Sequence, residues 1–182
     1  HQVALVTPPE AVIFAEAQRR GLPVIGLPIA RKHLRPLIAM RQWLADHAQG
    51  FDLINTHSST DSWLVAVANA TLGSAARLPV VRTRHVSTAV HPKASSTWLY
   101  QRATAHIVTT GEVLRQQLHR DNGFDLATMT SVRTGIDLTR FRPLPQAACR
   151  AERGQPEAPT LGILATLRDW KGHDYLLDAW QR

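Results

Sequence analysis

Cysteine is nearly absent from this sequence, because Cys149 is the one cysteine among 182 residues. A single cysteine cannot form an internal disulfide or a thiolate metal cluster, so neither a disulfide-stapled secreted fold nor a zinc finger is expected. A chain without disulfides fits a reducing, cytoplasmic setting.

Long apolar runs and aromatic residues are also scarce. No run approaches the roughly 18 to 20 residues that a membrane-spanning helix needs. Aromatic residues make up 6% of the chain, and basic residues never occur five in a row, so no nucleic-acid partner is expected. The chain opens directly on a strand-like run, His1 to Thr7, without a basic segment before it, which predicts no secretory signal here.

Several motifs with well-defined chemistry are missing as well. The sequence holds no GxGxxG fingerprint, no Walker lysine loop and no Gly-x-Ser-x-Gly elbow. It also lacks an Asp-x-Asp pair and the His-x-x-x-His zinc spacing. We therefore expect no dinucleotide cofactor and no bound metal.

Positive charge is what the chain has in excess, with a formal net charge of +7 at pH 7. Such an excess attracts anions, and an anionic membrane face or a phosphorylated small molecule would satisfy it. A merely solvated basic surface is the alternative. The hydrophobic content of 44% suffices for one full core, with the edge of a second.

Apolar strand-like runs alternate with helix-like stretches along most of the chain. Strands are expected near 3–6, 23–27, 51–56, 79–83, 106–109 and 130–133, with helices between them. This alternation predicts an α/β, Rossmann-like fold: a mostly parallel sheet with helices on both faces. Such sheets bind ligands at the carboxyl ends of their strands.

The pattern changes after Phe141, which suggests three segments. Residues 1–141 form the first domain, and residues 142–159, with four prolines, read as an interdomain linker. Residues 160–182 are predicted to be the first strand-helix unit of a second domain. Its strand would run over 160–164, and its helix would bury Tyr175, Leu176, Ala179 and Trp180.

Polar residues follow two of the expected strands. His57, Ser58 and Ser59 follow the strand 51–56, and His85 follows the strand 79–83. A histidine there can donate a hydrogen bond or act as a base near neutral pH. The alternative is that the serines, with Asp61, cap the next helix and that each histidine is a structural hydrogen-bonding group.

A second cluster is basic and lies where the last expected strand leads into a helix. Lys171 and Gly172 precede that helix, and Arg168 lies three residues before Lys171. Backbone N–H groups at a helix N-terminus with a cation beside them favour an anion. A solvated basic loop is the alternative.

Taken in order, several segments resemble family 4 of the glycosyltransferases, the retaining "group 1" enzymes with the two-domain GT-B architecture. The segments that carry the resemblance are 52–57 (DLINTH), 79–85 (PVVRTRH), 105–118, the hinge-like 134–143 (TGIDLTRFRP) and 161–172. The hinge-like segment is the most specific. Together they span nearly the whole chain in the family's order and spacing.

The resemblance implies a site as well as a fold. By match, His85 is the catalytic histidine that orients the transferred sugar through a hydrogen bond. His57, Ser58, Ser59, Thr134 and Gly135 would line the acceptor cleft. Lys171, Gly172 and Arg168 would neutralise the donor diphosphate, so transfer would need no metal and no cofactor beyond the nucleoside-diphosphate sugar itself.

The chain departs from the family pattern at three positions. The family's diphosphate arginine falls at Thr166, its hinge asparagine at Thr134, and the serine before Glu112 at Gly111. The family's first strand with its glycine-rich loop is expected to precede His1, and its paired-glutamate motif to follow Arg182. We therefore expect this segment to be inactive alone.

The resemblance implies a retaining glycosyltransferase of cell-envelope or polysaccharide biosynthesis. The acceptor would be a glycan, or a lipid-linked or phosphorylated molecule, and the enzyme would be cytoplasmic or peripheral at the inner membrane face. Two alternatives stay open: a GT-B sugar-nucleotide epimerase, which needs acidic cleft residues, and a non-catalytic or degenerate Rossmann-like module, which the substitution at Thr166 favours.

Overall fold

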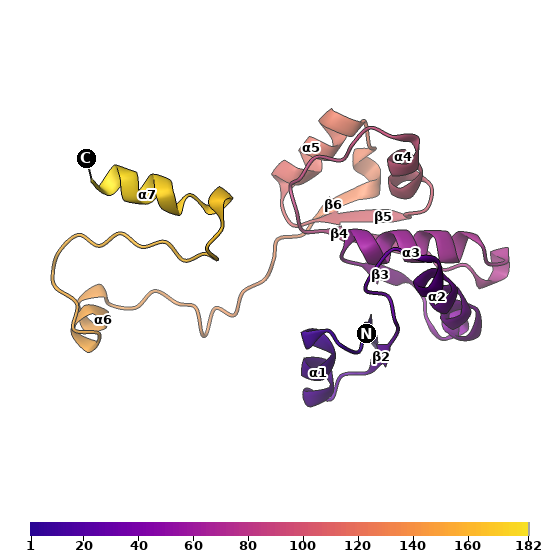
Figure 1. Cartoon of the computed structure of the whole chain (residues 1–182), viewed down its shortest axis with the longest axis horizontal. Helices are drawn as coiled ribbons and strands as arrows, with labels where there is room; N and C mark the ends of the chain where they lie inside the picture. The colour runs from indigo at the N-terminus through magenta and orange to yellow at the C-terminus, as the bar shows by residue number, and fades with distance from the viewer. Residues whose placement is uncertain (182) are drawn as a thin grey trace. The chain divides into compact units, whose positions relative to one another are not determined.

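A computed structural model describes residues 1–181 and divides the chain into two compact units. The first unit is His1–Gly135 and the second is Ile136–Arg182 (Figure 1). Each unit is described below by itself.

The first unit is built on parallel strands. Strands β1 (Leu5–Thr7) and β2 (Val24–Gly26) form a two-stranded sheet. Strands β3 (Ile54–Thr56), β4 (Val80–Arg84), β5 (His106–Thr109) and β6 (Met129–Ser131) form a second sheet in the order β3-β4-β5-β6. All pairings are parallel, which confirms the predicted α/β class, although the strands divide into two sheets.

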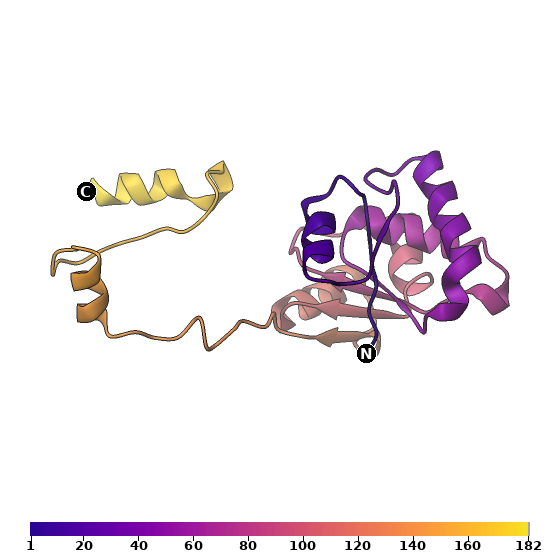
Figure 2. The same ribbon diagram turned by 90° about the horizontal axis from the view of Figure 1, so that it is seen from below.

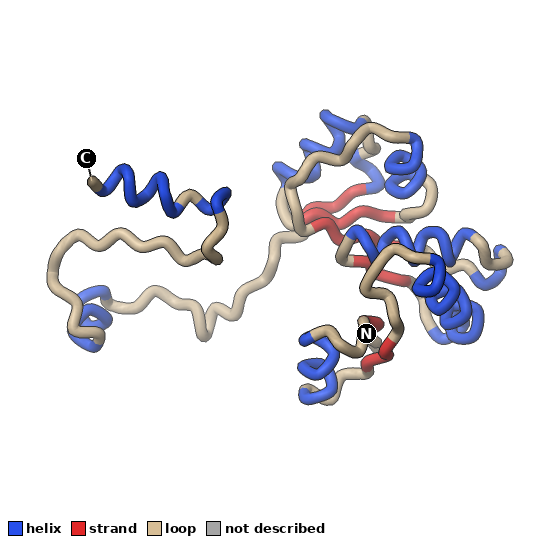
Figure 3. The backbone as a smooth tube through the Cα atoms, viewed as in Figure 1, coloured by secondary structure: helices blue, strands red, loops and turns tan. Residues whose placement is uncertain are grey.

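Helices connect and cover these strands, as the tube in Figure 3 shows. They are α1 (Val12–Arg19), α2 (Leu34–His47), α3 (Ser59–Ala70), α4 (Ala94–Gln101) and α5 (Glu112–Asn122). Short 3-10 turns cover Ala48–Gly50, Ser74–Ala76 and Leu126–Thr128. Helices α2 and α3 pack side by side (Figure 2).

Two hydrophobic clusters hold the first unit together, and α3 contributes to both. One joins α2 to α3 and β4 through Met40, Leu44, Leu64, Val65, Ala68 and Val80. The other joins α3, α4, α5, β5 and β6 through Ala66, Leu99, Tyr100, Ile107, Leu114, Leu118, Phe124 and Met129. Because α3 is buried on nearly every side, its first turn, at the carboxyl end of β3, is rigidly held.

The second unit contains α6 (Gln146–Glu152), a 3-10 turn (Asp169–Lys171) and α7 (His173–Trp180). The predicted linker therefore contains a helix: Pro145 sits just before α6, and the alanines that follow are strong helix formers. The helix predicted after Gly172 is present.

Two expectations for residues 160–182 were wrong. Residues 160–164 form no strand, because no other segment of the described chain pairs with them and a strand needs a partner's hydrogen bonds. The predicted buried face of α7 is largely exposed, with Tyr175 and Trp180 at 80% and 68% exposure. This unit buries none of its large apolar side chains fully, and the second domain stays a prediction.

Among residues 1–181, no helix is both long enough and apolar enough to cross a lipid bilayer.

The end of α5 provides a test of the backbone geometry. Gly123 terminates this helix at φ +67°, a conformation that side chains with a Cβ disfavour, and a Cβ there would meet no atom within 4 Å. Replacing Gly123 by alanine should therefore cost about 1 kcal/mol of unfolding free energy through backbone strain alone. Urea denaturation would measure it.

Gly73→Ala is the matched control, because Gly73 has φ −61° and equally open surroundings. It should be neutral or slightly stabilising, since alanine restricts the unfolded chain. Equal urea midpoints for the two variants would contradict the assigned helix end.

Candidate functional site

The two histidines that follow β3 and β4 meet at the carboxyl end of the sheet. Thr56 pairs with Arg82 in the parallel register, so His57 leaves β3 beside Thr83, and His85 follows two residues farther along β4 at the same edge of the sheet. His57 Nδ1 lies 3.0 Å from His85 Nε2. The two rings are stacked, with centroids 5.3 Å apart and planes 20° from parallel. The sequence had placed both residues on strand ends, and the register brings them into contact.

This contact limits the charge that the pair can carry. A hydrogen bond between two imidazoles needs one protonated and one unprotonated nitrogen, so at least one ring must be neutral. Partial burial lowers the pKa of His57 below its ordinary value of 6.5, the neighbouring His85 lowers it further, and the Asp61 carboxylate partly opposes them. His57 is therefore suited to hydrogen bonding as a neutral ring near neutral pH.

Ser58 and Asp61 form a capping box that fixes the backbone of His57. The Ser58 hydroxyl accepts hydrogen bonds from the N–H groups of Thr60 and Asp61, at 3.1 and 3.3 Å. The Asp61 carboxylate accepts in return from the N–H groups of Ser58 and His57, at 2.9 and 3.0 Å. The capping alternative is thus correct for Ser58 and Asp61, and the cleft role of Ser58 stays a prediction.

Ser59 has a partner that sequence reasoning missed. Lys32 lies 27 residues earlier, in the loop before α2, and its Nζ donates to the Ser59 hydroxyl at 2.8 Å. Lys32 Nζ also lies 6.0 Å from the ring centroid of Trp63. Burial lowers the pKa of Lys32, and the nearby Arg82 lowers it further. No local motif marks Lys32, because only the tertiary fold brings its loop to α3.

Two arginines of β4 were missed as well. Arg82 and Arg84 occupy alternate positions of the strand and are 6% and 8% exposed. The Arg82 guanidinium lies 4.4 Å from the ring centroid of Tyr100. Arg84 donates to the Tyr100 hydroxyl at 2.6 Å and also to the Thr88 carbonyl. Arg82 lies within the predicted strand 79–83 and Arg84 directly follows it, so their alternate positions were the available signal.

Both arginines keep buried donors without a partner among the described residues. These donors are Arg82 Nη1 and Arg84 Nε. Buried polar groups are nearly always hydrogen-bonded, so each orphan donor calls for an explanation.

Thr134 and Gly135 follow β6 at the end of the first unit, and both are exposed. No hydrogen bond between described residues joins either to the His57–His85 pair. A Cβ on Gly135 would meet nothing within 4 Å, so packing within the unit does not require a glycine there. Their assignment to the acceptor cleft stays a prediction.

The aspartate of the hinge-like segment, Asp137, stabilises a local turn. Asp137 Oδ1 accepts hydrogen bonds from the Thr139 hydroxyl at 2.6 Å and the Thr139 N–H at 2.9 Å. The Thr139 hydroxyl, followed by the N–H groups of Arg140 and Thr139, lowers the pKa of Asp137. Asp137 therefore closes a turn, which explains why this motif carries an aspartate.

The three predicted diphosphate residues lie in the second unit. Lys171 ends the 3-10 turn, and Gly172, at φ +77°, is the N-cap of α7. Arg168 Cζ lies 5.5 Å from the ring centroid of Trp170. The positive φ explains the glycine, because residues with a Cβ disfavour this conformation. The anion-binding role of these residues stays a prediction.

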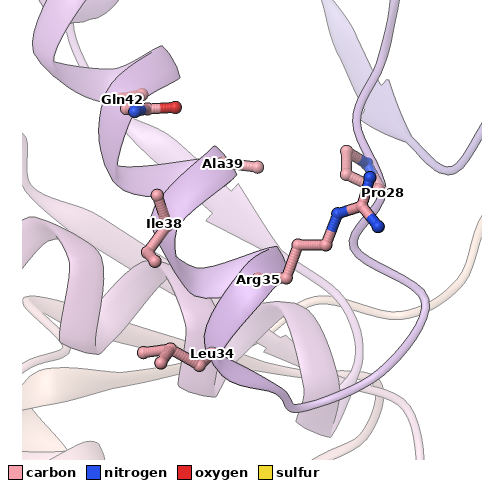
Figure 4. Close-up of a pocket in the computed structure, with 6 residues that line it drawn as sticks. All are labelled: Pro28, Leu34, Arg35, Ile38, Ala39 and Gln42. Atoms are coloured by element: carbon pink, nitrogen blue, oxygen red, sulfur yellow. The ribbon is translucent and has the colours of Figure 1, made fainter.

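A separate hollow of about 450 Å³ lies beside α2, as Figure 4 shows. Its lining residues are Pro28, Leu34, Arg35, Ile38, Ala39 and Gln42. It contains none of the predicted site residues. Within residues 1–181, no group of three His, Cys, Asp or Glu side chains is arranged to hold a metal ion.

The lowered pKa of His57 predicts a pH dependence of stability. The unfolded chain binds a proton to His57 at higher pH than the folded chain does. The contribution of His57 to the free energy of unfolding is therefore fully present above about pH 6.5 and is lost as the pH falls. His57→Gln should flatten the slope of unfolding free energy between about pH 7.5 and 5.5. Urea unfolding at several pH values measures this.

His91→Gln serves as the control, because His91 is exposed in the loop after β4 and its side chain makes no hydrogen bond with the histidine pair among the described residues. It should leave the contribution of His57 to the slope in place. If the His57 variant has the same slope as the wild type, the pKa assignment is wrong.

Solved structures that resemble this chain include a protein described as a glycosyltransferase. A glycosyltransferase from Rickettsia africae ESF-5 superposes with a TM-score of 0.74 at 15% identity, over 99% of this chain and 48% of that protein. Anabaena Alr3699/HepE, solved in complex with UDP, gives 0.74 at 16% identity, over 97% and 49%. Acinetobacter baumannii MurG gives 0.50 at 14% identity, over 81% and 38%.

These likenesses show the fold, and the chain spans about half the length of the first two structures. No curated protein sequence matches the chain significantly. The sequence profile described as Glycosyltransferase Family 4 matches residues 1–140, more than three quarters of the chain. The chain therefore belongs to glycosyltransferase family 4 and has the GT-B type of fold.

Proposed function

We propose that this chain is the acceptor-side part of a retaining glycosyltransferase that uses a nucleoside-diphosphate sugar. The His57–His85 pair at the carboxyl end of β3 and β4 is the observation that carries the proposal. A site at this edge of a parallel sheet is where such folds bind ligands. Membership of the family supplies the class of reaction.

In the proposed reaction, the bond between the sugar's anomeric carbon and the diphosphate breaks, and the acceptor hydroxyl bonds through its oxygen to that carbon with the configuration retained. The proton of that hydroxyl passes to the departing diphosphate. His85, held by His57, donates a hydrogen bond that orients the transferred sugar. Lys171, Gly172 and Arg168 stabilise the negative charge on the departing diphosphate, the role that cations and helix N-termini commonly fill. No metal takes part.

The donor assignment is supported by the Anabaena structure, which was solved with UDP. We propose a glycan, or a lipid-linked or phosphorylated molecule, as the acceptor, in keeping with the net charge of +7. Cell-envelope or polysaccharide synthesis in the cytoplasm, or at the inner membrane face, is the proposed setting. His57, Ser58, Ser59, Thr134 and Gly135 are proposed to line the acceptor cleft.

One alternative function has a specific observation in its favour. Thr166 stands where the family has its diphosphate arginine, which favours a degenerate, non-catalytic module. An epimerase has less support, because the carboxylate beside the histidine pair, Asp61, is engaged by backbone N–H groups as a helix cap.

The test compares donor turnover by the full-length gene product across a panel of sugar nucleotides, with and without EDTA. His85→Ala should lower turnover about 10- to 100-fold, as expected for a lost hydrogen bond. Lys171→Ala should lower it about 100-fold or more, because a charge on the leaving group is no longer stabilised.

His91→Ala and Lys93→Ala are the matched controls, since both residues are exposed and lie outside the proposed site. They should leave turnover within about twofold of the wild type, a change worth less than 0.5 kcal/mol. Absence of turnover with every donor, or turnover indifferent to both site changes, would favour the non-catalytic module. Loss of turnover in EDTA would refute the metal-independent mechanism.

A further inference from the structure

Three cationic side chains gather near the histidine pair without an ion-pair partner. They are Lys32, Arg82 and Arg84. Every ion pair among the described residues lies elsewhere, on α1 and α5. Asp61 is close enough to Arg82 to influence it, but its carboxylate already accepts the N–H groups that start α3. The cluster therefore has more positive charge than its surroundings balance.

Arg82 is the member for which this imbalance is most costly. It is 6% exposed, and its Nη1 has no hydrogen-bond partner within residues 1–181. Stacking on Tyr100 engages the face of the guanidinium but none of its in-plane N–H groups. A buried, incompletely paired charge destabilises a fold unless an acceptor, best an anion, completes it.

Lys32 places a second cation at the surface beside Arg82. It is exposed, and its hydrogen bond to Ser59 holds it at the start of α3, next to the strand residue Thr56 that lies opposite Arg82. Partial burial, followed by the charge of Arg82, lowers the pKa of Lys32. One of its three donors is used by the Ser59 hydroxyl, which leaves two for a ligand. Ser59 is the first residue of the 12-residue helix α3, so the positive end of a helix dipole faces the same place.

We propose that Lys32, Arg82 and the Ser59 hydroxyl at the start of α3 bind a phosphate group of the acceptor. A phosphate group carries up to two negative charges and three acceptor oxygens, which match two cations and their free donors. That this phosphate belongs to the acceptor rests on the proposed function, whereas phosphate binding itself does not. The site adjoins the His57–His85 pair through Ser58 and Ser59, so a bound acceptor would reach the proposed reaction centre.

Inorganic phosphate is the probe for this site. The chain, labelled with ¹⁵N, would be titrated with sodium phosphate and, in parallel, with sodium chloride at matched ionic strength, following amide signals. Phosphate should shift the signals of residues at the start of α3 and around Lys32. Lys32→Gln should weaken this binding about 10-fold, as expected for a lost charge-assisted hydrogen bond.

Arg41→Gln is the matched control, because it removes one positive charge from an exposed position of α2 without touching the cluster. It should change phosphate affinity less than about twofold, because salt screens the attraction between a bound phosphate and a distant surface charge. Lys32 is exposed, so its variant should fold, and the unchanged remainder of the spectrum would show this.

Two sources could present the phosphate, and a second arm separates them. Sedimentation with phosphatidylglycerol vesicles that requires Lys32 and is competed by inorganic phosphate would identify a lipid headgroup. Binding of phosphate and glucose 6-phosphate without vesicle binding would identify a soluble phosphorylated acceptor. Either result supports the site.

Equal weakening of phosphate binding by Lys32→Gln and Arg41→Gln would overturn the proposal, because it would show general attraction to a basic surface. Phosphate shifts confined to regions away from α3 would overturn it too. Neither result bears on sugar transfer, since no donor is present, so failure here and failure of the proposed function are distinguishable.

Discussion

The parallel pairing of β3 with β4 is the constraint on which the candidate site depends. Because Thr56 lies opposite Arg82, the residues that leave both strands emerge at one edge of the sheet. His57 and His85 meet there, and the capping box of Ser58 and Asp61 fixes the backbone of His57 at the start of α3. A shift of one residue in this register would turn Arg82 and Arg84 to the opposite face and separate the histidines.

The same register fixes the electrostatics of the edge. Arg82 and Arg84 are held on the inward face of β4, where Tyr100 of α4 packs against both guanidinium groups. Burial and the nearby charge of Arg82 lower the pKa of Lys32, and burial and the neighbouring His85 lower the pKa of His57. The cations therefore leave an excess of positive charge beside the histidine pair. Neutral hydrogen-bonding groups next to fixed cations suit a ligand with hydroxyls and an anionic group, such as a phosphorylated sugar acceptor.

Much of the first unit could be predicted from the sequence, because its helices and strands alternate with local signals at their ends. His57 and His85 were found because strand ends are visible in the pattern. Lys32 could not be found, since it reaches Ser59 only through the packing of α2 on α3. The strand expected at 160–164 failed for a related reason: strand formation depends on a partner, which local apolar content does not reveal. The face of α7 that was predicted to be buried is exposed for the same reason, because burial also depends on a packing partner.

The most direct test of the central claim, that the strand register joins His57 and His85 through one hydrogen bond, is long-range ¹H–¹⁵N spectroscopy of the imidazole rings near neutral pH. The account predicts a proton held between His57 Nδ1 and His85 Nε2, with a titration of each ring that changes when the other is replaced by glutamine. Two rings that titrate independently, each with an ordinary pKa of about 6.5 and no shared proton, would contradict it.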